Sequence, residues 1–198
     1  MQQEKYLIIG LGNPGKKYVL TYHNLGFIVL DHLLAKVAPD VDFALTKKMN
    51  AKIAKTIINN KQVILVKPQT FMNLSGQATI ACVNYFKIPL ENILIVHDDS
   101  DLELGRIRFV KNSGAGGHNG INSIIQSLGT KNFARLKIGI RSSAKYNETI
   151  TKARELVLKQ ITKSDQLILK RKTKTILSAI NCFLKHNIEM SCNLYNGI

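Results

Sequence analysis

Two polar clusters of this sequence contain side chains that could carry acid–base chemistry. The first is His23, which lies near the end of the glycine-rich stretch GLGNPGKKYVLTYHNLG, residues 10–26, between polar neighbours. The second is HDDSD, residues 97–101, which directly follows the apolar run of residues 93–96. A carboxylate that accepts a ring N–H fixes the tautomer of a histidine and stabilises its imidazolium. His23 with one of these carboxylates is therefore a candidate base for activating water.

Other kinds of catalytic site fit the same residues less well. The sequence has no G-x-S-x-G elbow and no cysteine in a nucleophile-like context, so covalent catalysis has no obvious nucleophile. His97 and Asp98 could ligate a metal ion. The comparable His-Asp pair of metal phosphohydrolases lies on a helix, however, whereas this pair follows a predicted strand. A metal site therefore remains an alternative.

A dinucleotide site is a further alternative. The segment GLGNPG, residues 10–15, matches the fingerprint G-x-G-x-x-G after a predicted strand. Pro14 occupies the turn that should open the phosphate-binding helix. Asp31, at the distance expected for the ribose-binding acid, lies inside a helical pattern instead of at a strand end. These two positions disfavour dinucleotide binding.

Amide side chains recur where predicted elements end. Asn13 lies in the first glycine-rich loop, Asn73 follows Phe71 and Met72, and Asn119 belongs to the second glycine-rich loop, SGAGGHNG. An amide both donates and accepts hydrogen bonds, so it suits a peptide backbone or a sugar, although asparagine also forms turns. Their recurrence in such clusters favours a binding role.

The charge of the chain is strongly and unevenly positive. The formal net charge is +15, from 28 Lys and Arg against 13 Asp and Glu. Residues 1–130 carry 14 basic and 9 acidic side chains, and residues 131–174 carry 13 basic and 3 acidic ones. A concentrated basic surface favours a polyanionic partner, most often nucleic acid, over a merely solubilising surface.

Strand-like and helix-like segments alternate along the chain around these residues, which predicts an α/β fold with a mixed, mostly parallel sheet flanked by helices. We expect a single domain over residues 1–198, ending in basic helices. The turn Asn59-Asn60 predicts a tight hairpin. The predicted strands cover residues 5–10, 51–58, 61–67, 92–97, 106–110 and 135–140; the predicted helices cover 24–38, 74–86, 121–128, 151–160 and 163–186.

The cysteines and the apolar segments of the sequence indicate where in the cell the protein is located. The three cysteines are scattered and odd in number, the amino terminus lacks the pattern of a signal peptide, and no apolar run has membrane-spanning length. We therefore expect a reduced, cytoplasmic protein.

Six segments together resemble the bacterial-type peptidyl-tRNA hydrolases. They occur in the order and spacing of that family, cover residues 6 to about 160, and are far more specific together than any one alone. They are GLGNPG at 10–15, Y…T-x-H-N-x-G at 18–26, KPQTFMNLSG at 67–76, HDDSDLELG at 97–105, GAGGHNGINSI at 114–124 and FARLKIGI at 133–140.

The resemblance implies an enzyme that cleaves the ester between a peptide and the 3′ ribose of tRNA, and so recycles tRNA from aborted translation. It implies that His23 activates water and that Asp98 is its carboxylate partner. Asn13, Asn73 and Asn119 would hold the peptidyl ester and the water, and Met72 would line the peptide channel. Tyr18 and Phe71, in the matching segments, are expected to contact substrate as well.

The resemblance also implies tRNA contacts, which fall on Arg106, Arg108, Lys111 and Arg135. It implies a monomer that needs no metal and no cofactor, with residues 151–160 as a lid over the cleft. One difference is Tyr22, because the family usually has arginine before the histidine. The alternative from another functional class is a non-catalytic RNA-binding protein on the same scaffold.

Overall fold

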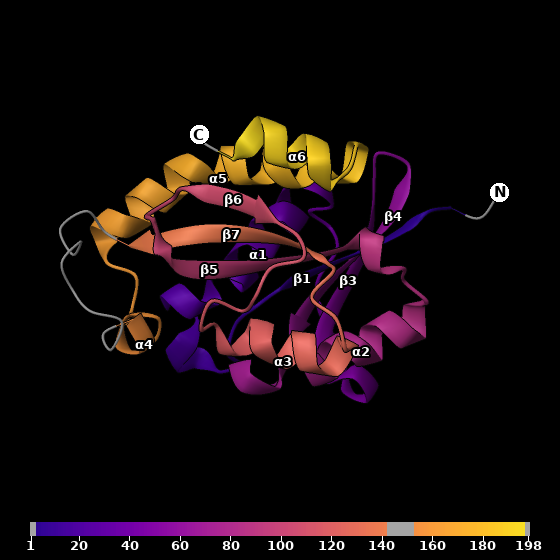
Figure 1. Cartoon of the computed structure of the whole chain (residues 1–198), viewed down its shortest axis with the longest axis horizontal. Coiled ribbons are helices and arrows are strands. Elements are labelled where there is room, and N and C mark those ends of the chain that lie inside the picture. The colour runs from indigo at the N-terminus through magenta and orange to yellow at the C-terminus, as the bar shows by residue number, and fades with distance from the viewer. Residues whose placement is uncertain (1–2, 142–152, 197–198) are drawn as a thin grey trace.

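One twisted sheet organises the protein in the computed structural model, which describes residues 3–141 and 153–196 (Figure 1). Within these residues the sheet has seven strands in the order β2-β3-β4-β1-β5-β7-β6. The four central strands β4, β1, β5 and β7 are parallel, whereas β3 and β6 run antiparallel to their neighbours. The strands are β1 Lys5–Gly10, β2 Ala44–Thr46, β3 Ala51–Ile58, β4 Lys61–Pro68, β5 Ile93–Glu103, β6 Ile107–Val110 and β7 Ala134–Arg141.

Helices cover both faces of the sheet, as Figure 1 shows. α5 and α6 lie over one face, and α2 and α3 lie over the other. This arrangement confirms the predicted α/β class with a mixed, mostly parallel sheet. The helices are α1 Leu25–Val37, α2 Ser75–Phe86, α3 Asn119–Leu128, α4 Ala153–Leu156, α5 Lys163–Lys185 and α6 Ile188–Tyr195.

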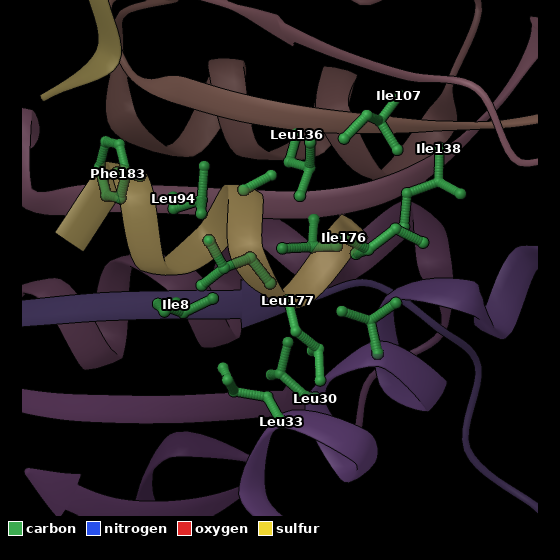
Figure 2. Close-up of a cluster of buried hydrophobic side chains, with 14 of the residues drawn as sticks. Ile8, Leu30, Leu33, Leu94, Ile107, Leu136, Ile138, Ile176, Leu177 and Phe183 are labelled. Atoms are coloured by element: carbon green, nitrogen blue, oxygen red, sulfur yellow. The ribbon is translucent and has the colours of Figure 1, made fainter. Parts of the chain in front are cut away.

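The two faces of the sheet bury two hydrophobic cores. Ile8 of β1 faces the larger core, where Leu30 and Leu33 of α1 meet Ile176 and Leu177 of α5 (Figure 2). Leu7 and Ile9, one residue to either side of Ile8, face the second core with α2 and α3. Successive side chains of a strand point to opposite faces, so a strand buried on both sides is apolar throughout. This is why the central strands read as continuous apolar runs.

A close backbone contact brings the start of α1 against the end of β1. A Cβ atom added to Gly26 would lie 2.3 Å from the backbone nitrogen of Leu11 and 2.4 Å from the carbonyl oxygen of Val96. A Cβ atom at Gly10 would lie 2.3 Å from the carbonyl oxygen of Gly26. Only glycine allows this approach, and it places His23, one turn before Gly26, beside the carboxyl end of β1 and the middle of β5.

The Asn59-Asn60 hairpin is confirmed. β3 and β4 pair antiparallel, and both turn residues have positive φ angles, 52° and 61°. Asparagine tolerates this left-handed conformation better than other residues with a side chain.

Some predicted boundaries are wrong. β5 does not end before the acidic cluster but continues to Glu103, because its pairing with β7 runs through Asp99 and resumes at Glu103 after an irregularity. The predicted helix over 151–160 is helical only in α4; residues 151 and 152 lie outside the described part of the chain, and residues 157–161 run beside residues 20–23. β2 and α6 were not predicted.

Candidate active site

The ring of His23 meets the carboxylate of Asp98 just beyond the carboxyl end of β1, in the middle of β5. His23 belongs to the short 3-10 helix η2 (Tyr22–Asn24), which leads into α1, and Asp98 lies on β5. Nδ1 of His23 lies 2.9 Å from one carboxylate oxygen of Asp98 and 3.0 Å from the other. Both residues are buried, with 7% of His23 and 1% of Asp98 exposed. The structure therefore brings together the two residues that the sequence singled out.

His118 is a third member of this site, and sequence reasoning did not single it out. Its Nε2 lies 3.1 Å from Oδ1 of Asp98, and its ring centroid is 4.9 Å from that of His23. His118 also caps α3, because its Nδ1 accepts hydrogen bonds from the backbone N–H groups of Gly120 and Ile121 at 3.1 and 3.3 Å. Its place directly before the helix in the second glycine-rich loop is a sequence signal for the capping role, but not for the contact with Asp98.

The capping bonds determine where the ring protons lie. A nitrogen that accepts from two backbone N–H groups carries no hydrogen, so a neutral His118 is protonated on Nε2 and donates to Asp98. Asp98 can only accept when ionised, so Nδ1 of His23 donates to it as well. The neutral His23 ring then has its free lone pair on Nε2. Asp98 thus fixes the tautomer that a water-activating base requires.

The electrostatics of Asp98 follow from the same contacts. Burial alone would raise the pKa of this carboxyl, but the charges and hydrogen bonds of His23 and His118 hold the pKa well below its usual range. Asp98 is therefore an anion in the folded protein near neutral pH. It is available to stabilise a proton on His23.

His97 completes the polar centre from the neighbouring position on β5. Only 1% of it is exposed, its Nδ1 lies 2.6 Å from the carbonyl oxygen of Asp98, and its ring packs edge-on against that of His118 at 4.7 Å. Burial is the largest cause that lowers the pKa of His97 well below its ordinary value, and the charge of His118 lowers it further. His97 is a neutral, structural histidine that supports Asp98 and His118.

Asn13 is held rigidly beside this centre. Asn24 pairs with its backbone, accepting from the Asn13 N–H at 2.8 Å and donating to the Asn13 carbonyl at 3.0 Å. The side-chain oxygen of Asn13 accepts from the backbone N–H of Met72 at 2.8 Å, which leaves the amide NH₂ as its donor. In the sequence Asn24 is only a polar neighbour of His23, and its role as a clamp on Asn13 depends on a fold contact that no spacing reveals.

The other expected substrate residues have varied surroundings. Met72 is buried, and a Cβ atom at Gly120 would lie 2.5 Å from its sulfur, so α3 begins directly against this side chain. Asn73, in the 3-10 helix η4 (Met72–Leu74), and Asn119, the first residue of α3, are exposed. Phe71 is 56% exposed. Tyr18 is half-buried, and the ammonium of Lys17 lies 4.8 Å from its ring centroid.

The residues expected to contact tRNA divide into two groups. Arg106, Arg108 and Lys111 are exposed on or beside the edge strand β6. Arg135 is fully buried, and its guanidinium donates to the backbone carbonyls of Ser113 and Gly114. With no exposed surface, the Arg135 side chain offers tRNA phosphates no contact in this structure and instead holds the second glycine-rich loop.

Lys137 supplies a cation that the sequence did not single out. It lies opposite Arg108 in the pairing of β6 with β7, and its ammonium pairs with the carboxylate of Asp99. Residues directly opposite each other on neighbouring strands point to the same face of the sheet. Arg108 and Lys137 therefore lie on the same face of the sheet, where the ammonium of Lys137 is paired with Asp99.

The capping of His118 also bears on metal binding. The ligand atoms of His23, Asp98 and His118 lie within 4.8 Å of one another, as a metal centre would require. A neutral His118 that bound a metal through Nε2 would carry its proton on Nδ1, facing the backbone N–H groups of Gly120 and Ile121. This donor set fits a hydrogen-bonded dyad better than a metal.

Comparisons with known proteins agree with this architecture. The family model for Peptidyl-tRNA hydrolase matches residues 7–198. The chain belongs to the peptidyl-tRNA hydrolase family. A peptidyl-tRNA hydrolase of Lactobacillus johnsonii is 44% identical over 96% of this chain and 99% of its own length. One of Lactobacillus gasseri is 52% identical over 70% of this chain and 74% of its own length.

A solved structure of the family has the same fold. The crystal structure of peptidyl-tRNA hydrolase from Acinetobacter baumannii superposes with a TM-score of 0.88 and 30% identity, covering all of this chain and 97% of that one. Family membership confirms the resemblance and the expectation of an enzyme, a hydrolase associated with translation. Nothing in these comparisons favours the non-catalytic alternative. Across residues 3–141 and 153–196, no helix has both the length and the apolar character needed to span a bilayer.

Proposed function

We propose that this chain hydrolyses the ester that joins a peptide to the 3′ ribose of tRNA, with His23 as the base that activates water. The observation that supports the proposal most strongly is that the carboxylate of Asp98 accepts hydrogen bonds from two histidines. Two histidine N–H groups point at it, so the remaining lone pair of His23 is on Nε2. Cleavage of peptidyl-tRNA frees the tRNA for another round of aminoacylation.

The reaction follows from this arrangement. Nε2 of His23 takes a proton from water as the water oxygen attacks the ester carbonyl carbon, and Asp98 stabilises the imidazolium that forms. When the tetrahedral intermediate collapses, the C–O bond to the ribose breaks and His23 returns the proton to the ribose oxygen. The products are a free peptide carboxyl group and the 3′ hydroxyl of tRNA. Neither step needs a metal or a cofactor.

We propose that amide groups bind the reacting ester. The Asn13 NH₂ group is rigidly held, and a preorganised donor stabilises charge that develops on a carbonyl oxygen. Asn73 and Asn119 are exposed on neighbouring elements, so they would hold the peptide backbone and the water. Met72, Phe71 and Tyr18 would contact the substrate around them.

We propose that the tRNA lies on the basic surface of β6 and β7. Arg106, Arg108 and Lys111 are exposed there, and Lys137 extends the surface toward Asp99. Phosphate contacts supply affinity that does not depend on the nucleotide sequence. We further propose that the protein acts as a single-domain monomer in the cytoplasm; its three thiols are unpaired, as in a reduced protein.

The direct test is hydrolysis of a purified peptidyl-tRNA, with and without EDTA. We expect release of free tRNA at an unchanged rate in the chelator. An inactive wild-type protein would contradict the function. Activity lost in EDTA and restored by a divalent ion would contradict the metal-free mechanism.

A further inference from the structure

The segment that follows α4 is bonded directly to the backbone of the proposed catalytic histidine. The N–H of His23 donates to the carbonyl of Val157 at 2.8 Å, and the N–H of Tyr22 donates to the carbonyl of Lys159 at 3.3 Å. In the reverse direction the N–H of Ile161 donates to the carbonyl of Leu20 at 2.7 Å. These bonds form a short antiparallel ladder. The backbone of His23 is thus anchored to a segment from the far end of the chain.

A buried side-chain contact closes this ladder. The hydroxyl of Tyr22 donates a short hydrogen bond to the carboxylate of Asp165, and the two residues are only 3% and 8% exposed. Asp165 lies in the first turn of α5, where Thr162 accepts from its backbone N–H at 3.2 Å. A carboxylate is favoured at a helix amino terminus by the exposed N–H groups there. Burial, then the bond to Asp165, raises the pKa of Tyr22 to about 12, so the phenol remains a donor.

The position of this contact matters because Tyr22 and His23 are adjacent in η2. Tyr22 ties one end of that single turn to α5, which is 23 residues long and packs on the sheet through its buried face. The ring of His23 reaches Asp98 from the next position of the same turn. A rotation of η2 would move the imidazole away from a carboxylate that is itself fixed on β5.

We propose that Tyr22 and Asp165 are positioning residues for the hydrolysis, because their buried hydrogen bond fixes η2 and therefore the reach of His23 to Asp98. This inference rests on the function proposed above. It also gives a role to the position at which this chain departs from the usual family pattern: a tyrosine before the histidine supplies a donor for α5.

The test is the steady-state kinetics of Tyr22→Phe and Asp165→Ala on peptidyl-tRNA. We expect kcat to fall roughly tenfold in each variant, with KM changed less than about twofold, since the chemistry depends on orientation and tRNA binding does not. Tyr6→Phe is a matched control, because the hydroxyl of Tyr6, on β1, donates a hydrogen bond to the Glu4 carboxylate at 3.1 Å. It removes a less buried tyrosine–carboxylate bond at the start of β1, together with the bond that the Tyr6 hydroxyl accepts from Lys61 at 3.1 Å, and should leave kcat unchanged.

Two further variants separate positioning from general loss of stability. Asp165→Asn keeps an acceptor for the Tyr22 hydroxyl, so it should retain most of the kcat that Asp165→Ala loses. The double variant Tyr22→Phe/Asp165→Ala should be no slower than the slower single variant, because both remove one interaction. Amide exchange at His23 and Ile161 should accelerate in Tyr22→Phe and not in Tyr6→Phe.

The proposal is overturned if Tyr22→Phe and Asp165→Ala keep wild-type kcat, even with a lowered Tm, since the pair is then only structural. It is also overturned if the two losses multiply in the double variant. Both results require an active wild-type protein, so they are distinct from a failure of the proposed function, in which the wild type itself does not hydrolyse peptidyl-tRNA.

Discussion

The polar centre around Asp98 and the basic surface of β6 are both rich in charge, but they are built in opposite ways. Asp98 is 1% exposed and receives hydrogen bonds from His23 and His118. Arg106 and Arg108 are exposed on or beside an edge strand. In a buried centre the partners and protons are fixed before substrate arrives, whereas exposed cations keep their side-chain freedom and their water.

Because the two regions differ in burial, each should control a different kinetic parameter. A preorganised, water-poor centre acts on the transition state and therefore on kcat. Exposed cations attract phosphates through a screened, salt-dependent interaction and therefore act on KM. Substitutions in one region that changed the kinetic parameter assigned to the other would contradict this assignment.

The largest expected effect is that of His23→Ala. We expect kcat to fall by ~10²–10⁴, the usual contribution of a positioned base, with little change in KM. Single-turnover hydrolysis of peptidyl-tRNA measures the fall. His32→Ala is the matched control, because His32 is exposed on α1 and should leave kcat unchanged. An unchanged kcat in a folded His23→Ala protein would exclude His23 as the base.

Asp98→Asn should come next. It keeps the shape but removes the negative charge and offers His23 an amide that no longer imposes the Nδ1–H tautomer, so we expect kcat to fall ~10²-fold or more. Asp99→Asn is the matched control, because Asp99 is bonded to Lys137 instead of His23. If Asp99→Asn is the damaging change and Asp98→Asn is silent, the wrong carboxylate has been assigned.

A smaller effect is expected on the basic surface. Arg106→Ala/Arg108→Ala should raise KM for peptidyl-tRNA. The slope of log KM against log salt concentration should become shallower by ~0.9 for each phosphate that the protein no longer neutralises. Hydrolysis of a minimal peptidyl-nucleoside ester should be nearly unchanged. Lys170→Ala/Lys174→Ala removes two charges from α5 and should leave KM unaltered; a larger effect there would move the tRNA footprint to α5.

The smallest expected effect concerns the stability of the fold at low pH. The pKa of His97 is lowered in the folded state, so the unfolded chain binds a proton that the folded one does not as pH falls below about 6.5. The contribution of neutral, buried His97 to the free energy of unfolding is complete above that pH. It is lost below that pH, by up to ~1.4 kcal/mol per pH unit. His97→Gln should lose less stability than wild type between about pH 7 and pH 5 in urea titrations, since it has no such proton to bind; parallel losses would contradict this.

Much of the fold could be predicted because local pattern and tertiary structure agree. The apolar runs of β1 and β5 reflect burial on both faces, and Asn59-Asn60 reflects a turn that needs positive φ angles. β2 was missed because it is three residues long and largely exposed. The end of β5 was predicted too early because the residues after its apolar run are polar. These residues nevertheless still pair with β7.

The candidate site was less completely predictable. His23 could be paired with a carboxylate of residues 97–101 because a polar cluster after an apolar run is a recognisable signal, and the family resemblance then identified that carboxylate as Asp98. His118 could not, since its contact with Asp98 depends on where α3 begins, and the clamp of Asn24 on Asn13 depends on the packing of η2. The family resemblance placed Arg135 among the tRNA contacts, but the resemblance gave no sign that its side chain is fully buried on β7.

One crossed kinetic experiment tests the division between the two regions most directly. Asp98→Asn and Arg106→Ala/Arg108→Ala are each measured on peptidyl-tRNA and on a minimal peptidyl-nucleoside ester. We predict that Asp98→Asn lowers kcat on both substrates, and that the arginine variant raises KM on peptidyl-tRNA alone. Equal losses of kcat from both variants on both substrates would contradict this division, because the basic surface would then belong to the chemistry or to the fold.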